Sequence, residues 1–68
     1  MVTKEQVREF GRQSRESGYL YAAAVAAHAL GEPYHTMALS PAALARLDAM
    51  SRTEAADAVR RMIAASVR

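Results

Sequence analysis

The stretch YLYAAAVAAHAL, residues 19–30, decides how this chain can fold. It is apolar on every side except at His28, and no charged residue interrupts it. A helix that is apolar all round must also be covered all round. We therefore expect this segment to lie at the centre of the fold, and its apolar excess favours contact with a second copy or another protein.

The rest of the 68-residue chain favours helices within one domain. Alanine, the best helix former, is abundant, and no run of β-branched or aromatic residues could build a strand. We expect an all-α fold, a small helical bundle that spans residues 1–68. Cysteine is absent, which excludes disulfides and thiolate metal sites. Because a core of this size is marginally stable, tight helix packing or self-association must supplement it.

The N-terminal half favours one long helix over about residues 4–30. Thr3 and Gln6 have the spacing of a capping box, and Gly31 suits the end of the helix. Gly18 leaves two alternatives, because it either ends a first helix or lies inside the long one. We favour the long helix, since one stripe of residues passes through Gly18 without a change of phase. Such a helix would be about 40 Å long, and half of it would project beyond the rest of the chain.

Two short helices are predicted over about residues 41–50 and 52–66. Ser40 precedes a proline, which is a typical start for the first of them. The run SRTE at residues 51–54 is a capping box that starts the second. The loop at residues 31–39 carries apolar side chains, so we expect it to lie against the core.

A stripe of small and apolar residues along the predicted long helix is the candidate surface for self-association and for a protein partner. Its glycines and serine would let another helix approach closely, either the chain's own C-terminal helix or a second copy. Since only two short helices exist to cover the long one, we expect a homo-oligomer. The predicted interface consists of Val7, Phe10, Gly11, Ser14, Gly18, Tyr19, Leu20, Tyr21, Val25, His28 and Leu30.

Arginines recur at helical spacing on the other side of the first half of this helix. Arg8, Arg12 and Arg15, together with Arg52, are the residues that could contact nucleic acid. Glutamates beside the first three favour a solvated helix face instead, because carboxylates repel phosphates. The net charge of +2 gives only weak support for a nucleic-acid partner. The two short helices invite a helix-turn-helix reading, but the predicted turn is shorter than that motif requires.

No catalytic or metal-binding motif is recognisable. His28 and His35, with Glu32 between them, supply too few ligands for a metal site, which needs three or four that converge. A histidine on an apolar face more commonly bonds to a backbone group or a neighbouring chain. The serines at 40 and 51 are explained by helix capping, and no nucleophile stands in a recognisable pattern with a base. We expect no enzyme activity, no cofactor and no metal.

Neither export nor membrane insertion is predicted. The N-terminus is charged and polar and lacks the apolar region of a secretory signal. The apolar segment at residues 19–30 is shorter than the roughly 20 residues that span a bilayer. We therefore expect a soluble, cytoplasmic protein.

The segment MSRTEAADAVRRMIAA, residues 50–65, resembles small uncharacterised helical proteins of actinobacteria and their phages. In those proteins a Ser/Thr-x-x-Glu-Ala start precedes an amphipathic helix that ends in isoleucine or leucine. The opening TKEQ, residues 3–6, is similar to theirs as well. The resemblance implies no activity and suggests a small, phage-type accessory protein.

These features favour a non-enzymatic helical interaction module that self-associates and binds a protein partner. A protein of this kind would act by binding and blocking a larger cellular protein. The alternative is a small DNA-binding regulatory protein that uses the arginines or the helix pair at residues 41–66.

Overall fold

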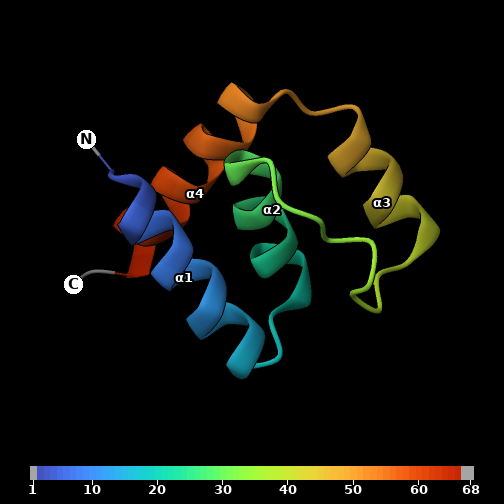
Figure 1. Ribbon diagram of the computed structural model, residues 1–68, viewed down its shortest axis with the longest axis horizontal. Helices are drawn as coiled ribbons and strands as arrows, with labels where there is room; N and C mark the ends of the chain where they lie inside the picture. Colours follow the sequence, from blue (N-terminus) through green and yellow to red (C-terminus); the bar gives the residue numbers. More distant parts are fainter. Residues whose placement is uncertain (1, 67–68) are drawn as a thin grey trace.

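The computed structural model describes residues 2–66, which form four α-helices and no strand. The helices are α1 (Lys4–Glu16), α2 (Leu20–Leu30), α3 (Pro41–Asp48) and α4 (Arg52–Ser66). The predicted all-α fold is therefore confirmed. Helices α1, α2 and α4 pack together, and α3 lies on the other side of α2 from α1 (Figure 1).

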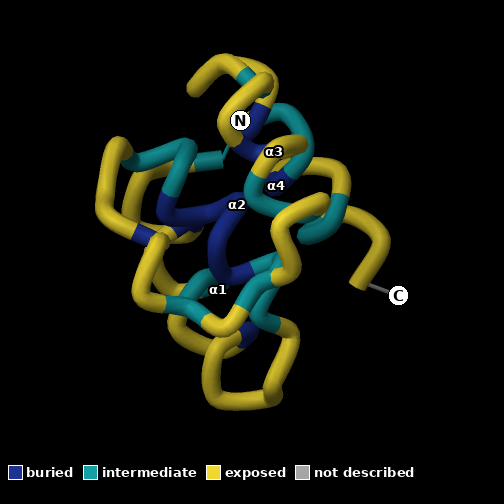
Figure 2. Tube along the Cα trace, turned by 90° about the vertical axis from the view of Figure 1, so that its right-hand side faces the viewer, coloured by how far each residue is buried: buried dark blue, intermediate teal, exposed yellow. Residues whose placement is uncertain are grey.

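Helix α2 is the central element of the fold. Helices α1, α3 and α4 all pack against it, and the buried part of the chain follows it in Figure 2. Its buried residues run without interruption from Ala23 to Ala27, and four of these five are alanines. Such small side chains let the neighbouring helices approach closely. The apolar stretch thus lies at the centre as predicted, and the chain itself supplies much of its cover.

The favoured long helix over residues 4–30 is wrong, because the chain reverses at Gly18. Gly18 has φ +82°, a left-handed conformation that glycine adopts readily. Its N–H donates to the Arg15 carbonyl at 3.2 Å. The next N–H, that of Tyr19, donates to the Ser14 carbonyl at 2.8 Å, which completes a Schellman motif. Helices α1 and α2 then run antiparallel (Figure 1), so the alternative in which Gly18 ends a first helix is confirmed.

The predicted helix starts are confirmed by their caps. The Thr3 hydroxyl accepts the Gln6 N–H, and the Gln6 side chain accepts the Thr3 N–H. The Ser40 hydroxyl caps α3. Ser51 and Glu54 form the second capping box, and the Ser51 backbone N–H holds the pKa of the Glu54 carboxyl below its usual value. Local sequence signals therefore place three of the four helix starts.

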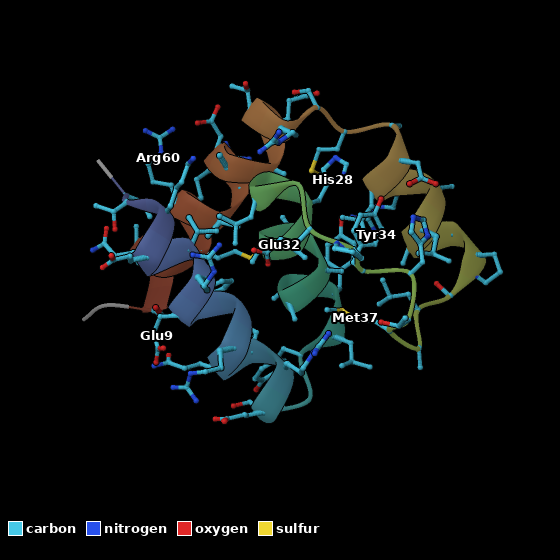
Figure 3. The ribbon with its side chains drawn as sticks, in the orientation of Figure 1. Glu9, His28, Glu32, Tyr34, Met37 and Arg60 are labelled. Atoms are coloured by element: carbon cyan, nitrogen blue, oxygen red, sulfur yellow. The ribbon has the colours of Figure 1, made fainter. Side chains whose placement is uncertain are left out.

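The loop after α2 and the end of α3 are joined by side-chain hydrogen bonds. The Tyr34 hydroxyl donates to the Asp48 carboxylate at 2.6 Å, and this bond raises the pKa of Tyr34. The His28 Nε2–H donates to the Met50 carbonyl at 2.6 Å, and the His28 ring meets Tyr34 edge-on (Figure 3). The expectation that the loop lies against the core is confirmed, and of the two alternatives for His28, a backbone group or a neighbouring chain, the structure shows the backbone group.

The folded chain is compact on its own. Its radius of gyration is 10.9 Å, which matches the value of about 11 Å expected for a compact domain of this length. Among the four helices of residues 2–66 none projects from the rest, so the predicted unsupported half of a long helix is not found there. Within residues 2–66, no helix is long and apolar enough to cross a membrane.

Candidate protein-binding groove

The predicted interface stripe is in large part an internal contact between α1 and α2. Val7, Ser14 and Val25 are buried within a single chain. A Cβ at Gly11 would lie 3.1 Å from the Ala26 Cβ, so the missing side chain lets α1 approach α2. The close approach predicted for the small residues is therefore made by the chain's own α2. These positions are not available to a partner in this fold.

The other residues of the predicted interface reach the surface to different degrees. Tyr19 is 70% exposed, and Gly18 beside it is exposed at the turn between α1 and α2. The remaining members are half-buried: Phe10, Leu20, Tyr21, His28 and Leu30. Phe10 and Leu30 line separate hollows. The structure therefore divides the predicted interface into a buried part and several separate surface patches.

The histidines and Tyr34 form a structural cluster. Within residues 2–66, no group of three or more His, Asp or Glu side chains is placed to hold a metal ion. His28 is engaged by the Met50 carbonyl, and the His35 ring stacks on Tyr34 with the ring centroids 4.6 Å apart. In the same part of the chain, every buried side-chain nitrogen and oxygen has a hydrogen-bond partner. The cluster thus fixes the loop to α3.

Arg8, Arg12 and Arg15 form an arginine ridge on the exposed side of α1. Arg12 is held between two glutamates of the same helix, Glu9 and Glu16, the latter at 2.8 Å. The hydrogen bond to Glu9 and the charge of Glu16 raise the pKa of Arg12. The Arg12 bond in turn lowers the pKa of Glu9. The predicted proximity of glutamates to the ridge is therefore confirmed at its centre.

The other two members of the arginine ridge have different surroundings. Arg8 reaches across to Glu32 in the segment after α2, with 2.8 Å between Nη2 and Oε2 (Figure 3 labels Glu32). Arg15 makes no ion pair with any carboxylate of residues 2–66. Arg52, the fourth arginine of the alternative prediction, lies instead against Gly31 at the C-terminal end of α2. There its charge complements the helix dipole.

The arginine ridge forms the rim of an open groove between α1, α2 and the segment that follows α2. The groove has a volume of about 420 Å³. Its floor is made of small and apolar residues: Val7, Gly11, Ala23, Ala26 and Ala27. Leu30, Pro33 and Met37 continue the apolar lining, and Glu32 is its single acidic residue. The groove is therefore apolar at the base and positive at the rim.

Sequence reasoning missed the part of this groove that follows α2. The sequence suggests Glu32 only as a metal ligand, and the loop at residues 31–39 only as a segment that lies against the core. Glu32 and its partner Arg8 are separated by 24 positions, which no helical spacing connects. The sequence signal that could have indicated this pairing is Gly31. Because α2 ends at Gly31, the chain turns there and brings Glu32 close to α1.

The pair α3–α4 does not have the packing of a helix-turn-helix. Residues 49–51 separate the two helices, so the turn is longer than predicted and reaches the length of that motif. The helices nevertheless make at most marginal contact with each other: α3 packs on α2, and α4 packs on α2 and α1 (Figure 1). On α4, Arg60 pairs with Asp57 at 2.8 Å. This geometry gives DNA binding through the pair no support.

Comparison with known proteins adds no information to these observations. No protein-family model, curated protein or solved structure matches the chain. The resemblance of residues 50–65 to proteins of actinobacteria and phages stays a prediction.

Proposed function

We propose that this protein acts by binding another protein, without catalysing a reaction, and that the arginine-rimmed groove is its binding surface. The groove itself carries this proposal, because an apolar hollow with a few charged groups at its edge is typical of a binding site. Burial of the accessible apolar lining, Leu30, Pro33 and Met37, would supply affinity, and the arginines would supply orientation and specificity.

The charges around the groove favour a protein over nucleic acid. Arg12 is already paired with two glutamates, and Arg8 is paired with Glu32. A phosphate backbone laid along the ridge would meet these carboxylates as well as the arginines. DNA binding stays the alternative, and a titration with duplex DNA at two salt concentrations tests it. A steep loss of affinity with salt would favour the alternative.

The proposal includes the cellular role predicted from the sequence. A small phage-type accessory protein in the cytoplasm would block a larger protein by occupying one of its exposed segments. We also propose that copies of the chain associate through the exposed corner at Tyr19 and Leu20, the part of the predicted interface nearest the α1–α2 turn. The exposure of Tyr19, at 70%, supports this assignment.

Capture from a lysate of the cells that produce the protein tests the function. The baits are the natural protein, an Arg15→Glu variant and an Arg61→Glu variant. Arg61 is exposed on α4 and does not line the groove, so its variant controls for the same change of charge. We expect one protein or a few to bind the natural chain and the Arg61 variant and to be lost from the Arg15 variant. Equal retention by all three baits would contradict a role for the groove.

A further inference from the structure

The lining of the groove also indicates which kind of protein segment it takes; this inference rests on the function proposed above. We propose that the groove binds an amphipathic helix that presents carboxylates to Arg8 and Arg15 and apolar side chains to the accessible lining residues Leu30, Pro33 and Met37.

The spacing of the arginine ridge matches a helix laid alongside α1. Arg8, Arg12 and Arg15 are four and three residues apart, which corresponds to about 6 and 4.5 Å along a helix axis. Carboxylates at i and i+7 of a partner helix lie on one face and match Arg8 and Arg15, whereas Arg12 between them is already paired with Glu9 and Glu16. Guanidinium groups bind carboxylates with two parallel hydrogen bonds, so each match adds orientation as well as attraction.

Two members of the ridge are open to a new carboxylate. Arg15 has no acidic partner within residues 2–66 and should make the strongest new ion pair. Arg8 is paired with Glu32, but the two side chains are 59% and 45% exposed. An ion pair this exposed to solvent contributes little stability, so a partner's carboxylate can displace Glu32 at small cost. Glu32 therefore acts as an internal competitor of the ligand.

The apolar lining that a partner can reach consists of Leu30, Pro33 and Met37. Ala26 and Ala27 of the floor are at most 9% exposed, because α1 already packs on α2 there, so the contact area for a partner comes from the larger side chains. A second hollow, between α1 and the end of α4, has the opposite character, because Glu5 and Glu9 line it and it carries no arginine. An acidic helix is therefore directed to the arginine-rimmed groove and away from this acidic hollow.

Selection from a peptide library tests the inference without a known partner. A display library of helical peptides of about 15 residues, a length at which isolated helices become marginally stable, is panned against the full-length protein. We expect the selected peptides to carry acidic residues at i and i+7 beside apolar positions. In chemical-shift mapping, binding of the best peptide should shift the amide signals of Arg15, Leu30 and Met37.

The contribution of each ion pair is then measured as the change in affinity for the best peptide, with variants of the protein compared by fluorescence anisotropy. Arg15→Glu should weaken binding about tenfold and Arg15→Gln by less, while Arg61→Glu should change it by less than about twofold. Glu32→Gln should tighten binding by roughly two- to fivefold, because it removes the internal competitor. Replacing the peptide's acidic residues by glutamine should weaken binding and abolish most of its salt dependence. Thermal melts confirm that each variant is folded.

The outcomes separate the inference from the proposed function. Selected peptides that bind in the groove but are neutral or basic would overturn the acidic-helix inference and leave the groove as a protein-binding site. Failure to select any peptide, or selection of peptides that map to Phe10 and Ile63 in the acidic hollow, would overturn both. If the Glu32→Gln variant binds the peptide more weakly than the natural protein does, the proposed displacement of Glu32 from Arg8 by a peptide carboxylate is wrong.

Discussion

Gly18 determines the path of the chain through its own backbone conformation, φ +82°, and a Cβ built there has no neighbour within 4 Å. Its replacement therefore measures backbone strain alone. We expect Gly18→Ala to lower the free energy of unfolding by about 1–2 kcal/mol. Gly18→Asn should lower the free energy of unfolding by less, because asparagine tolerates the left-handed region. Urea denaturation measures both variants, and an alanine variant as stable as the natural protein would contradict the left-handed turn.

Tyr34 gives the fold a dependence on alkaline pH. Its hydrogen bond to Asp48 raises the pKa of the phenol in the folded state, so folding favours the neutral form. The resulting stabilisation is complete below the pKa of an unfolded tyrosine, about 10, and is lost as the pH rises through the higher folded value. We expect Tyr34→Phe to lower the urea midpoint at neutral pH. Above about pH 10, the difference between the two proteins should shrink; a constant difference would show that Asp48 does not perturb the phenol.

Among the elements, α3 depends most on a single side chain. It has eight residues, too few for a helix that is stable alone, and Leu47 is its fully buried contact. We expect Leu47→Ala to reduce the free energy of unfolding by about 2–5 kcal/mol. The Arg46 guanidinium lies 5.1 Å from the centre of the Tyr21 ring, and we expect Arg46→Ala to reduce the free energy of unfolding by less than about 1 kcal/mol. Urea denaturation measures both variants. Equal losses of unfolding free energy in the two would show that burial of Leu47 is not what holds α3 in place.

The elements were predictable from the sequence where a local signal decides them. The capping groups of Thr3, Ser40 and Ser51 act within three residues, and each predicted start is confirmed. At Gly18 the sequence favours the wrong alternative, because the periodicity of a stripe describes only which residues share a face. It does not tell whether the helix continues. The reversal is favoured by packing of α1 on α2, which only the folded chain contains.

At the scale of the molecule, the sequence identified the arginine ridge but not the groove it borders. Arg8, Arg12 and Arg15 could be grouped from their spacing alone. The floor requires α2 to lie beside α1, and the pairing of Arg8 with Glu32 requires the chain to return after Gly31. The predicted interface failed as one surface for the same reason: reversal of the chain turned much of it inward.

Folding and self-association should be separable in this molecule. Val7, Ser14 and Val25 are buried within one chain, so a stable core does not require a second copy. We expect the urea midpoint to stay constant over about a hundredfold range of protein concentration, whereas an obligate oligomer gains stability with concentration. Association through the exposed corner should appear in light scattering and be reduced by Tyr19→Ser, with the urea midpoint unchanged. A midpoint that rises with concentration would show that the single chain is not the folding unit, because mass action would then link assembly to stability.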